Sequence, residues 1–317
     1  MSLVHILRRL IALVAILFLV SALVFAITQI LPGNAAVMIL GQNATEAELK
    51  ALEGALDLDQ SAWVQYGRWI GGVLAGDAGV SMISNQPVME TVLTALGRSL
   101  VLAVIAVLVM ATVAIVLGVT AAVRRGRFAD LVISALTYPG VCVPEFVVGT
   151  LLVVLLARPE LGWFPAGGYS PPSAGLADFA RSIALPVLTL TIILTSRISR
   201  QVRSEMIDVL KSDYVRTATL KGLPRRAVLY RHALPNAMLP TLTILALDIG
   251  YLIGGIVVVE EVFAYPGLGR LLIFSMQSRD LPMIQAGVLV MAVVYVLANF
   301  AADLLHGFFD PRIRADA

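Results

Sequence analysis

The sequence predicts an all-α integral membrane protein with about six transmembrane helices. Three observations carry this prediction: the composition, the length of the uncharged apolar runs, and the distribution of the basic residues. Hydrophobic residues make up 59% of the 317 positions and charged residues 14%, against roughly 45–50% and about 25% in soluble domains. A soluble chain of this length could not bury so much apolar surface, so the composition excludes an ordinary soluble protein.

Six segments are candidate spans, because a helix needs about 20 apolar residues to cross a bilayer. The first is expected to be retained, since its apolar run is longer than that of a signal peptide and no clear cleavage site follows it. The fourth is short, but it can extend as a helix into an arginine-rich stretch. The six candidates are residues 10–27, 99–123, 131–157, 182–196, 233–259 and 281–302.

The basic residues set the predicted orientation. With six spans and the N-terminus inside, 16 of the 23 Lys and Arg residues fall on the cytoplasmic side. Basic residues concentrate in the cytoplasmic loops of membrane proteins. The sequence therefore predicts cytoplasmic N- and C-termini and places the basic loop of residues 204–235, called the coupling loop below, in the cytoplasm.

Three parts are expected along the chain. Residues 1–30 form the cytoplasmic N-terminus and first span, 31–96 an extracytoplasmic segment, and 97–317 a core of five spans that includes the coupling loop. In the extracytoplasmic segment Trp63, Tyr66 and Trp69 recur at helical spacing. They are interpreted either as an aromatic belt at the membrane surface or as a docking face for a binding protein, and both can hold.

The coupling loop contains a short helix with its own start and stop signals. Ser212 can cap its N-terminus and Asp213 suits that positive end, whereas Lys221 suits the negative C-terminal end. Gly222 can adopt the left-handed conformation after the last turn, and Pro224 can open a second helical stretch as its first residue. A loop that only joins two spans needs no capped helix, so we interpret this one as a rigid docking surface.

The spacing of this loop resembles the cytoplasmic motif of ABC importer permeases, often written EAA-x3-G-x9-I-x-LP. Gly222 is followed by nine residues and then by His232-Ala-Leu-Pro235. Arg216-Thr-Ala218 stands where Glu-Ala-Ala is usual, and His232 stands where Ile is usual. Both departures are typical of the dipeptide, oligopeptide and nickel permease branch, in particular its "B"-type subunit. The segments at 161–165, 262–270 and 310–312 resemble the same branch.

The resemblance implies a type I ABC importer permease in a bacterial inner membrane. It implies a homologous second permease, two ATPase subunits that bind ATP and Mg on the cytoplasmic face, and an extracytoplasmic substrate-binding protein. The expected substrate is a di- or oligopeptide, although nickel chelates, glutathione-like molecules and sugars use the same branch. The residues expected to couple to the ATPase are Asp213, Tyr214, Val215, Arg216, Thr217, Ala218, Lys221, Gly222, His232 and Pro235.

The helix of the coupling loop has two faces by spacing. Leu210, Tyr214 and Ala218 form one row at i, i+4 and i+8, and this row is expected to face protein. Arg216 lies on another face and is a candidate for a groove of the ATPase.

Two carboxylates lie within predicted spans, where an ionised group costs roughly 2.5–3.5 kcal/mol on insertion scales. Glu145 and Asp248 could line a translocation path, pair with a charge on another span or subunit, or form a proton relay that Asp303 alone could join. We favour the first two together.

Pro144, immediately before Glu145, adds a further signal. With Pro139 and Gly140 it should break the third span, and broken backbone is tolerated only against protein or a water-filled cavity. Pro144, Glu145 and Asp248 are therefore the candidates for the translocation path.

No catalytic or nucleotide-binding motif is present. The sequence lacks G-x-x-x-x-G-K-[ST] and G-x-S-x-G, so ATP hydrolysis is expected in partner subunits and an intramembrane enzyme is not favoured. Cys142 is the single cysteine and the three histidines are scattered, so no metal site and no cofactor of this chain is expected. No basic patch with interleaved aromatics suggests nucleic acid. The alternative is a stand-alone proton-coupled transporter, but the two related halves usual in that class are not visible.

Overall fold

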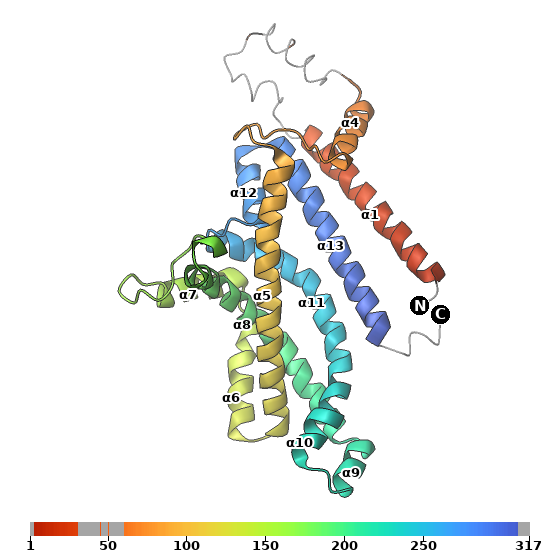
Figure 1. Cartoon of the computed structure of the whole chain (residues 1–317), viewed down its shortest axis with the longest axis vertical. Coiled ribbons are helices and arrows are strands. Elements are labelled where there is room, and N and C mark those ends of the chain that lie inside the picture. Colours follow the sequence, from red (N-terminus) through yellow and green to blue (C-terminus); the bar gives the residue numbers. More distant parts are fainter. Residues whose placement is uncertain (1–2, 31–44, 46–49, 51–59, 310–317) are drawn as a thin grey trace. The chain divides into compact units, whose positions relative to one another are not determined.

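The computed structural model of the chain describes residues 3–30, 45, 50 and 60–309 (Figure 1). These residues are predominantly helical, and their one β-type pairing is an isolated bridge between Val80 and Pro87. The predicted all-α class is therefore confirmed.

Five long helices coincide with predicted spans. A residue in an α-helix rises about 1.5 Å, so helices of this length match or exceed the thickness of a bilayer. They are α1 (Leu3–Ile30), α5 (Val88–Val123), α8 (Leu176–Leu210), α11 (Leu234–Val262) and α13 (Leu281–Phe309). The fourth predicted span does extend into the arginine-rich stretch, because α8 continues without interruption to Leu210.

The remaining predicted span, 131–157, is broken. Its parts are α6 (Phe128–Thr137), the 3₁₀ turn η1 (Pro139–Val141) and α7 (Glu145–Leu156). The two arms are bent by 115°. Pro144 stands in an extended conformation directly before α7, because proline cannot continue the preceding helical hydrogen bonds. The predicted break is confirmed, and it is a sharp reversal rather than a kink.

Within the described residues, four helices are long and apolar enough to cross a membrane, and the bent pair makes five if it is one span. α11 is outside that count, which covers described residues only, although α11 is 29 residues long and matches the predicted fifth span. The prediction of about six spans thus corresponds to six helical segments at the expected positions, four or five of which meet the criterion of length and composition.

Shorter elements connect the long helices. They are α4 (Ala62–Leu74), the 3₁₀ turn η2 (Pro172–Ala174), α9 (Asp213–Leu220), α10 (Arg225–Ala227), the π-helical turn η3 (Val228–Ala233) and α12 (Leu268–Ser278).

The chain divides into two compact units. Unit 1 comprises Ser99–Pro266 and the end of the chain from Leu297, and unit 2 comprises Leu3–Arg98 and Gly267–Val296. In unit 1, α8 is the central helix. Two thirds of its most apolar 18-residue stretch is buried, and α11, α7, α6 and η1 all pack on it. Close backbone approach makes this possible: a Cβ on Gly140 of η1 would collide with the hydroxyl of Ser196 on α8.

Unit 2 has its own apolar core between the start of α5, α12 and the start of α13. The buried Asp280 caps α13, because its carboxylate accepts from the backbone N–H of Met283 and also from Ser81 Oγ and the N–H of Met82. The aromatic row of α4 is divided. Tyr66 packs on α1, with its hydroxyl 2.7 Å from Ser21 Oγ, whereas Trp63 is exposed.

Candidate functional site

The helix expected in the coupling loop is α9, and its C-terminal end is built as predicted. Gly222 has a φ of +77°. The N–H of Gly222 donates to the carbonyl of Thr219, and the N–H of Leu223 donates to that of Ala218. This pair of bonds is a Schellman motif, which satisfies carbonyls left free at a helix end and requires a left-handed residue. The prediction for Gly222 is confirmed.

Two expectations are corrected, one at the start of α9 and one at the start of α10. Ser212 occupies the N-cap position, but its hydroxyl donates to the carbonyl of Val209 at 2.6 Å and makes no capping bond. The carbonyl of Val209, in the last turn of α8, also accepts from the backbone N–H of Ser212, so Ser212 bonds to the end of α8 rather than to the start of α9. Pro224 is the residue before α10 rather than its first residue, because its ψ of 140° is extended.

The face that α9 turns inward also differs from the prediction. Val215 and Ala218, spaced i and i+3, are buried in the core of unit 1. Tyr214 is 46% exposed, and Leu210 belongs to α8, so the expected row of Leu210, Tyr214 and Ala218 does not form a buried face. The difference arises because α9 starts a new helix after a break at residue 212, which resets the helical register. Arg216 is exposed, as expected.

The loop re-enters the core through η3, which carries His232. Pro235 follows in α11 and has no N–H for the carbonyl of Arg231, which its ring would also crowd. A wider π-helical turn lies at this point, and such turns often mark functional sites. The side-chain amide of Asn236 donates to the carbonyl of His232 at 2.7 Å, a further hydrogen bond at this turn.

A partly buried ion pair fixes the neighbouring hairpin. Asp130, in the first turn of α6, accepts from Arg203 Nε at 2.7 Å and Nη2 at 2.8 Å, and from the backbone N–H of Gly126 at 2.9 Å. α6 is thereby joined to α8 at Arg203, seven residues before α8 ends at Leu210. Figure 1 shows the α5–α6 turn at the same end of unit 1 as α9 and α10. Asp130 was not predicted as a structural residue from the sequence.

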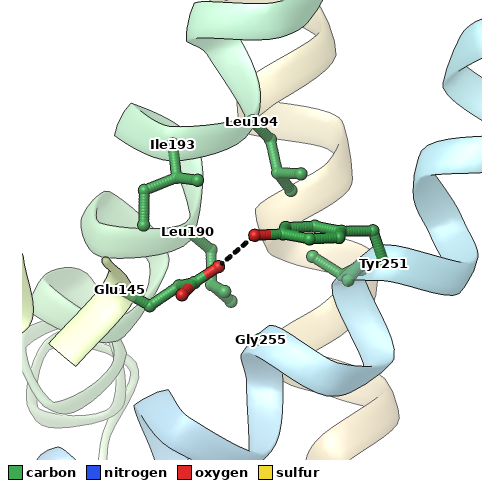
Figure 2. A pocket seen from close by; sticks show the side chains of 7 residues that line it. Glu145, Leu190, Ile193, Leu194, Tyr251 and Gly255 are labelled. Carbon is green, nitrogen blue, oxygen red and sulfur yellow. Dashed lines mark hydrogen bonds between the residues drawn. The ribbon is translucent and has the colours of Figure 1, made fainter. Parts of the chain in front are cut away.

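The two intramembrane carboxylates lie in one polar cluster that joins three helices of unit 1. Glu145, the first residue of α7, accepts a hydrogen bond from the Tyr251 hydroxyl of α11 at 2.9 Å (Figure 2). Asp248, one turn earlier on α11, pairs with Arg197 of α8 at 3.3 Å. The Arg197 guanidinium also lies over the Tyr251 ring, 5.3 Å from its centroid. Arg197 and Tyr251 thus connect the two carboxylates, and we call these four residues the polar cluster.

Burial within the polar cluster is uneven. The Asp248 side chain is 5% exposed, whereas that of Arg197 is 43% exposed. Tyr251 is exposed as well. The cluster therefore has a buried side at Asp248 and an open side at Arg197 and Tyr251.

A small pocket adjoins Glu145, with room for little more than one water molecule. Leu190, Ile193 and Leu194 of α8 form one wall, and Leu252 and Gly255 belong to α11 (Figure 2). A Cβ on Gly255 would lie 3.7 Å from Glu145 Oε1, so the glycine leaves room beside the carboxylate.

The cluster bears on the alternatives left open by the sequence. Asp248 does pair with a charge on another helix, and Glu145 is held by a hydroxyl rather than by a cation. Pro144 is exposed and lies outside the lining of the small pocket. The side chain of Asp303 lies outside the described residues, so a relay through it is not tested.

Arg197 and Tyr251 were missed by sequence reasoning. Arg197 was counted only as a cytoplasmic charge, because the fourth apolar run, residues 182–196, ends immediately before it. The signal for Tyr251 was its spacing of i+3 from Asp248, which places both on one face of a helix.

In the part of the chain that the structure describes, no group of three or more His, Cys, Asp or Glu side chains could hold a metal ion. Cys142 is exposed, in the turn between α6 and α7.

Comparisons with known proteins identify the family. Residues 114–315 match the model described as "Binding-protein-dependent transport system inner membrane component", and residues 2–115 match the model of the N-terminal part of such membrane components. A solved structure described as an amino acid ABC transporter with histidines has a TM-score of 0.47 at 17% identity, covering 70% of this chain and 94% of that one.

Curated relatives match over nearly their full length. The chain is 38% identical over 310 residues to the glutathione transport system permease protein GsiC of Salmonella paratyphi A, covering 98% of both chains. It is 36% identical over 311 residues to the probable peptide ABC transporter permease protein y4tP of Sinorhizobium fredii, covering 98% of this chain and 99% of that one. It is 34% identical over 332 residues to the dipeptide transport system permease protein DppB of Alkalihalophilus pseudofirmus, covering 98% and 99%.

The resemblance that the coupling loop indicated is confirmed, and nothing in these matches supports a stand-alone secondary transporter. The chain belongs to the family of binding-protein-dependent transport system inner membrane components, and it is a non-catalytic permease subunit of an ABC importer.

Proposed function

We propose that this permease imports di- or oligopeptides, including peptides of the size of glutathione, across a bacterial inner membrane. The names of its relatives support a peptide substrate. It acts with a second permease, two ATPase subunits that hydrolyse ATP with Mg, and an extracytoplasmic binding protein. Both termini and the coupling loop lie on the cytoplasmic side, as the positive-inside rule favours.

The observation that carries the coupling role is the construction of α9. Its inner face is anchored by Val215 and Ala218, and its end is fixed by the Schellman motif at Gly222. Its outer surface exposes apolar side chains at Tyr214 and Leu220 beside the charge of Arg216. An apolar centre with a polar rim is the usual composition of a protein interface.

A force on α9 has a direct path to the polar cluster. α9 follows α8 after two residues and is joined through α10 and η3 to α11. Arg197 lies on α8, and Asp248 and Tyr251 lie on α11. Closure of the ATPases would therefore move two of the three helices that carry the cluster, as a rigid-body change biased by nucleotide. Thr217, Lys221, His232 and Pro235 complete the proposed contact region.

Site-specific cross-linking tests the docking. In a Cys142→Ser background, Leu220→Cys places a thiol on α9 where the native side chain is 79% exposed. We expect it to cross-link to the ATPase subunit in the assembled complex. Leu176→Cys, at the first residue of α8, is the matched control, since Leu176 is 76% exposed but lies at the opposite end of that helix.

The control should stay unlinked to the ATPase. Cross-linking at Leu176 and not at Leu220, or stable transport-competent protein without any ATPase partner, would contradict the proposal. Uptake of dialanine and of glutathione by the reconstituted complex tests the substrate class.

A further inference from the structure

In the polar cluster, Arg197 is a partly exposed cation on α8 and Glu145 is a half-buried carboxylate at the start of α7. We propose that Arg197 and Glu145 form a two-point site for the charged ends of a peptide in transit, with Arg197 receiving the carboxylate and Glu145 the ammonium group. The inference rests on the proposed peptide substrate, and it adds the residues that would recognise its termini.

Arg197 has unused binding capacity. A guanidinium presents five N–H donors in a planar fork that matches a carboxylate. Among the described residues, its ion pair is a single contact from Nη1 to Asp248 Oδ1, at 3.3 Å. The Arg197 side chain is 43% exposed, and its guanidinium stacks over the Tyr251 ring. Asp248 and Tyr251 therefore hold the guanidinium in place while leaving one of its edges open.

Glu145 is held in a comparable way. Its Oε1 accepts from the Tyr251 hydroxyl, which leaves lone pairs on the second oxygen for a donor from outside the chain. Figure 2 shows the carboxylate and the hydroxyl pointing toward each other in the space between α8 and α11. Tyr251 thus positions both ends of the site, Glu145 through its hydroxyl and Arg197 through its ring.

The open side cannot face lipid without a large cost. Placing a charge against hydrocarbon is unfavourable, and charged side chains within spans usually face a cavity or another protein. The bend of 115° before Glu145 leads to the same conclusion, since interrupted backbone is tolerated only where it meets protein or water. The exposed edges of Arg197 and Tyr251 are therefore suited to a water-filled path.

The two proposed contacts are complementary to the two charges of a zwitterion. The cluster of two carboxylates and one guanidinium keeps its formal charge of −1 when such a peptide, which is neutral overall, binds. A peptide amidated at its C-terminus carries only the cation and loses the contact with Arg197. A peptide acetylated at its N-terminus loses the contact with Glu145.

The test compares dialanine with alanyl-alaninamide in proteoliposomes that contain the complete complex and its binding protein. Arg197→Gln alone would strand the buried Asp248 and could prevent assembly. The variant to measure is therefore Arg197→Gln together with Asp248→Asn, in which the pair is neutral. Since the binding protein is the same in every sample, its own preference cancels when the ratio of the two uptake rates is divided by the wild-type ratio.

We expect the preference for dialanine to fall by about tenfold or more in the double variant, the loss typical of a charge-assisted hydrogen bond. Glu145→Gln should instead reduce the preference for dialanine over N-acetyl-dialanine. Arg200→Gln is the matched control: it removes the same charge three residues along α8, where the side chain is exposed over Tyr138, and should leave both preferences unchanged.

Two results overturn the inference. If the double variant assembles and keeps the wild-type preference, Arg197 is only the structural partner of Asp248. If the wild-type complex imports neither dialanine nor glutathione, the proposed substrate class is wrong and the two-point site is wrong with it. If only the two-point site is wrong, the wild-type complex still imports peptides.

Discussion

Gly222 ends α9 with a φ of +77°, and no other atom lies within 4 Å of the position that a Cβ would occupy. Packing therefore does not require glycine here, and the constraint is the backbone conformation itself. Replacing Gly222 with Val puts a β-branched side chain in a left-handed conformation, at a cost of about 1–3 kcal/mol. The apolar area of the spans does not change, so insertion into the membrane should be unaffected.

We expect Gly222→Val to lower peptide uptake by about tenfold while the membrane level of the protein stays near that of the wild type. Gly222→Asn should retain more activity, because asparagine tolerates the left-handed region. Gly254→Ala is the control, since its Cβ also meets nothing within 4 Å and its φ is ordinary. Wild-type uptake by the Val variant would show that the left-handed end of α9 does not transmit force.

At the scale of elements, features that depend on a few neighbouring residues were mostly predicted from the sequence. The bounds of α9, the left-handed Gly222 and the break around Pro144 depend on residues within a few positions of each other, so they could be predicted. The role of Ser212 could not, because its hydroxyl could either accept from a free N–H at the start of α9 or donate to a carbonyl at the end of α8, and only the structure shows that it donates to Val209.

Contacts between elements that are distant in the chain could not be predicted from the sequence. Asp130 and Arg203 lie 73 residues apart, and Glu145 and Tyr251 lie 106 residues apart. No periodicity within one helix indicates which partner a charge will meet on another helix. The polar cluster could thus be predicted as two isolated carboxylates, but its organisation around Arg197 and Tyr251 could not.

The Asp130–Arg203 pair gives a prediction about the hairpin of α5 and α6. Asp130→Asn keeps the size of the side chain but removes the charge that two guanidinium nitrogens contact. We expect a loss of about 1.5–3 kcal/mol of stability, because a charge-assisted hydrogen-bonded pair is broken and a partly buried cation is stranded. The measurement is the thermal midpoint of the purified complex, together with the rate of trypsin cleavage at residues 124–127.

Cleavage in that turn should become faster in Asp130→Asn, since α6 is no longer held to α8. The double variant Asp130→Asn with Arg203→Gln is the control, because it removes the stranded cation and should recover part of the lost stability. If the single variant matches the wild type in both measurements, the ion pair does not fix the hairpin.

At the scale of the whole molecule, the question is where the energy for transport enters. The family places hydrolysis in separate subunits, and this sequence has no motif for binding nucleotide. A proton-coupled mechanism would require a chain of ionisable groups across the span. The described part of the core instead ties its two central carboxylates to a tyrosine and an arginine, in a cluster suited to holding charges in place.

Uptake of dialanine should therefore follow ATP and not the proton gradient. In proteoliposomes with the complete complex, we expect uptake to require ATP with Mg inside the vesicles on the ATPase side and to be insensitive to an uncoupler. The purified permease alone should show no ATPase activity, and vesicles containing only the permease are the control for passive leakage. If uptake continues without ATP and stops when the uncoupler is added, the importer is contradicted and the proton relay is favoured. Only a gradient-driven carrier depends on the proton gradient that the uncoupler collapses.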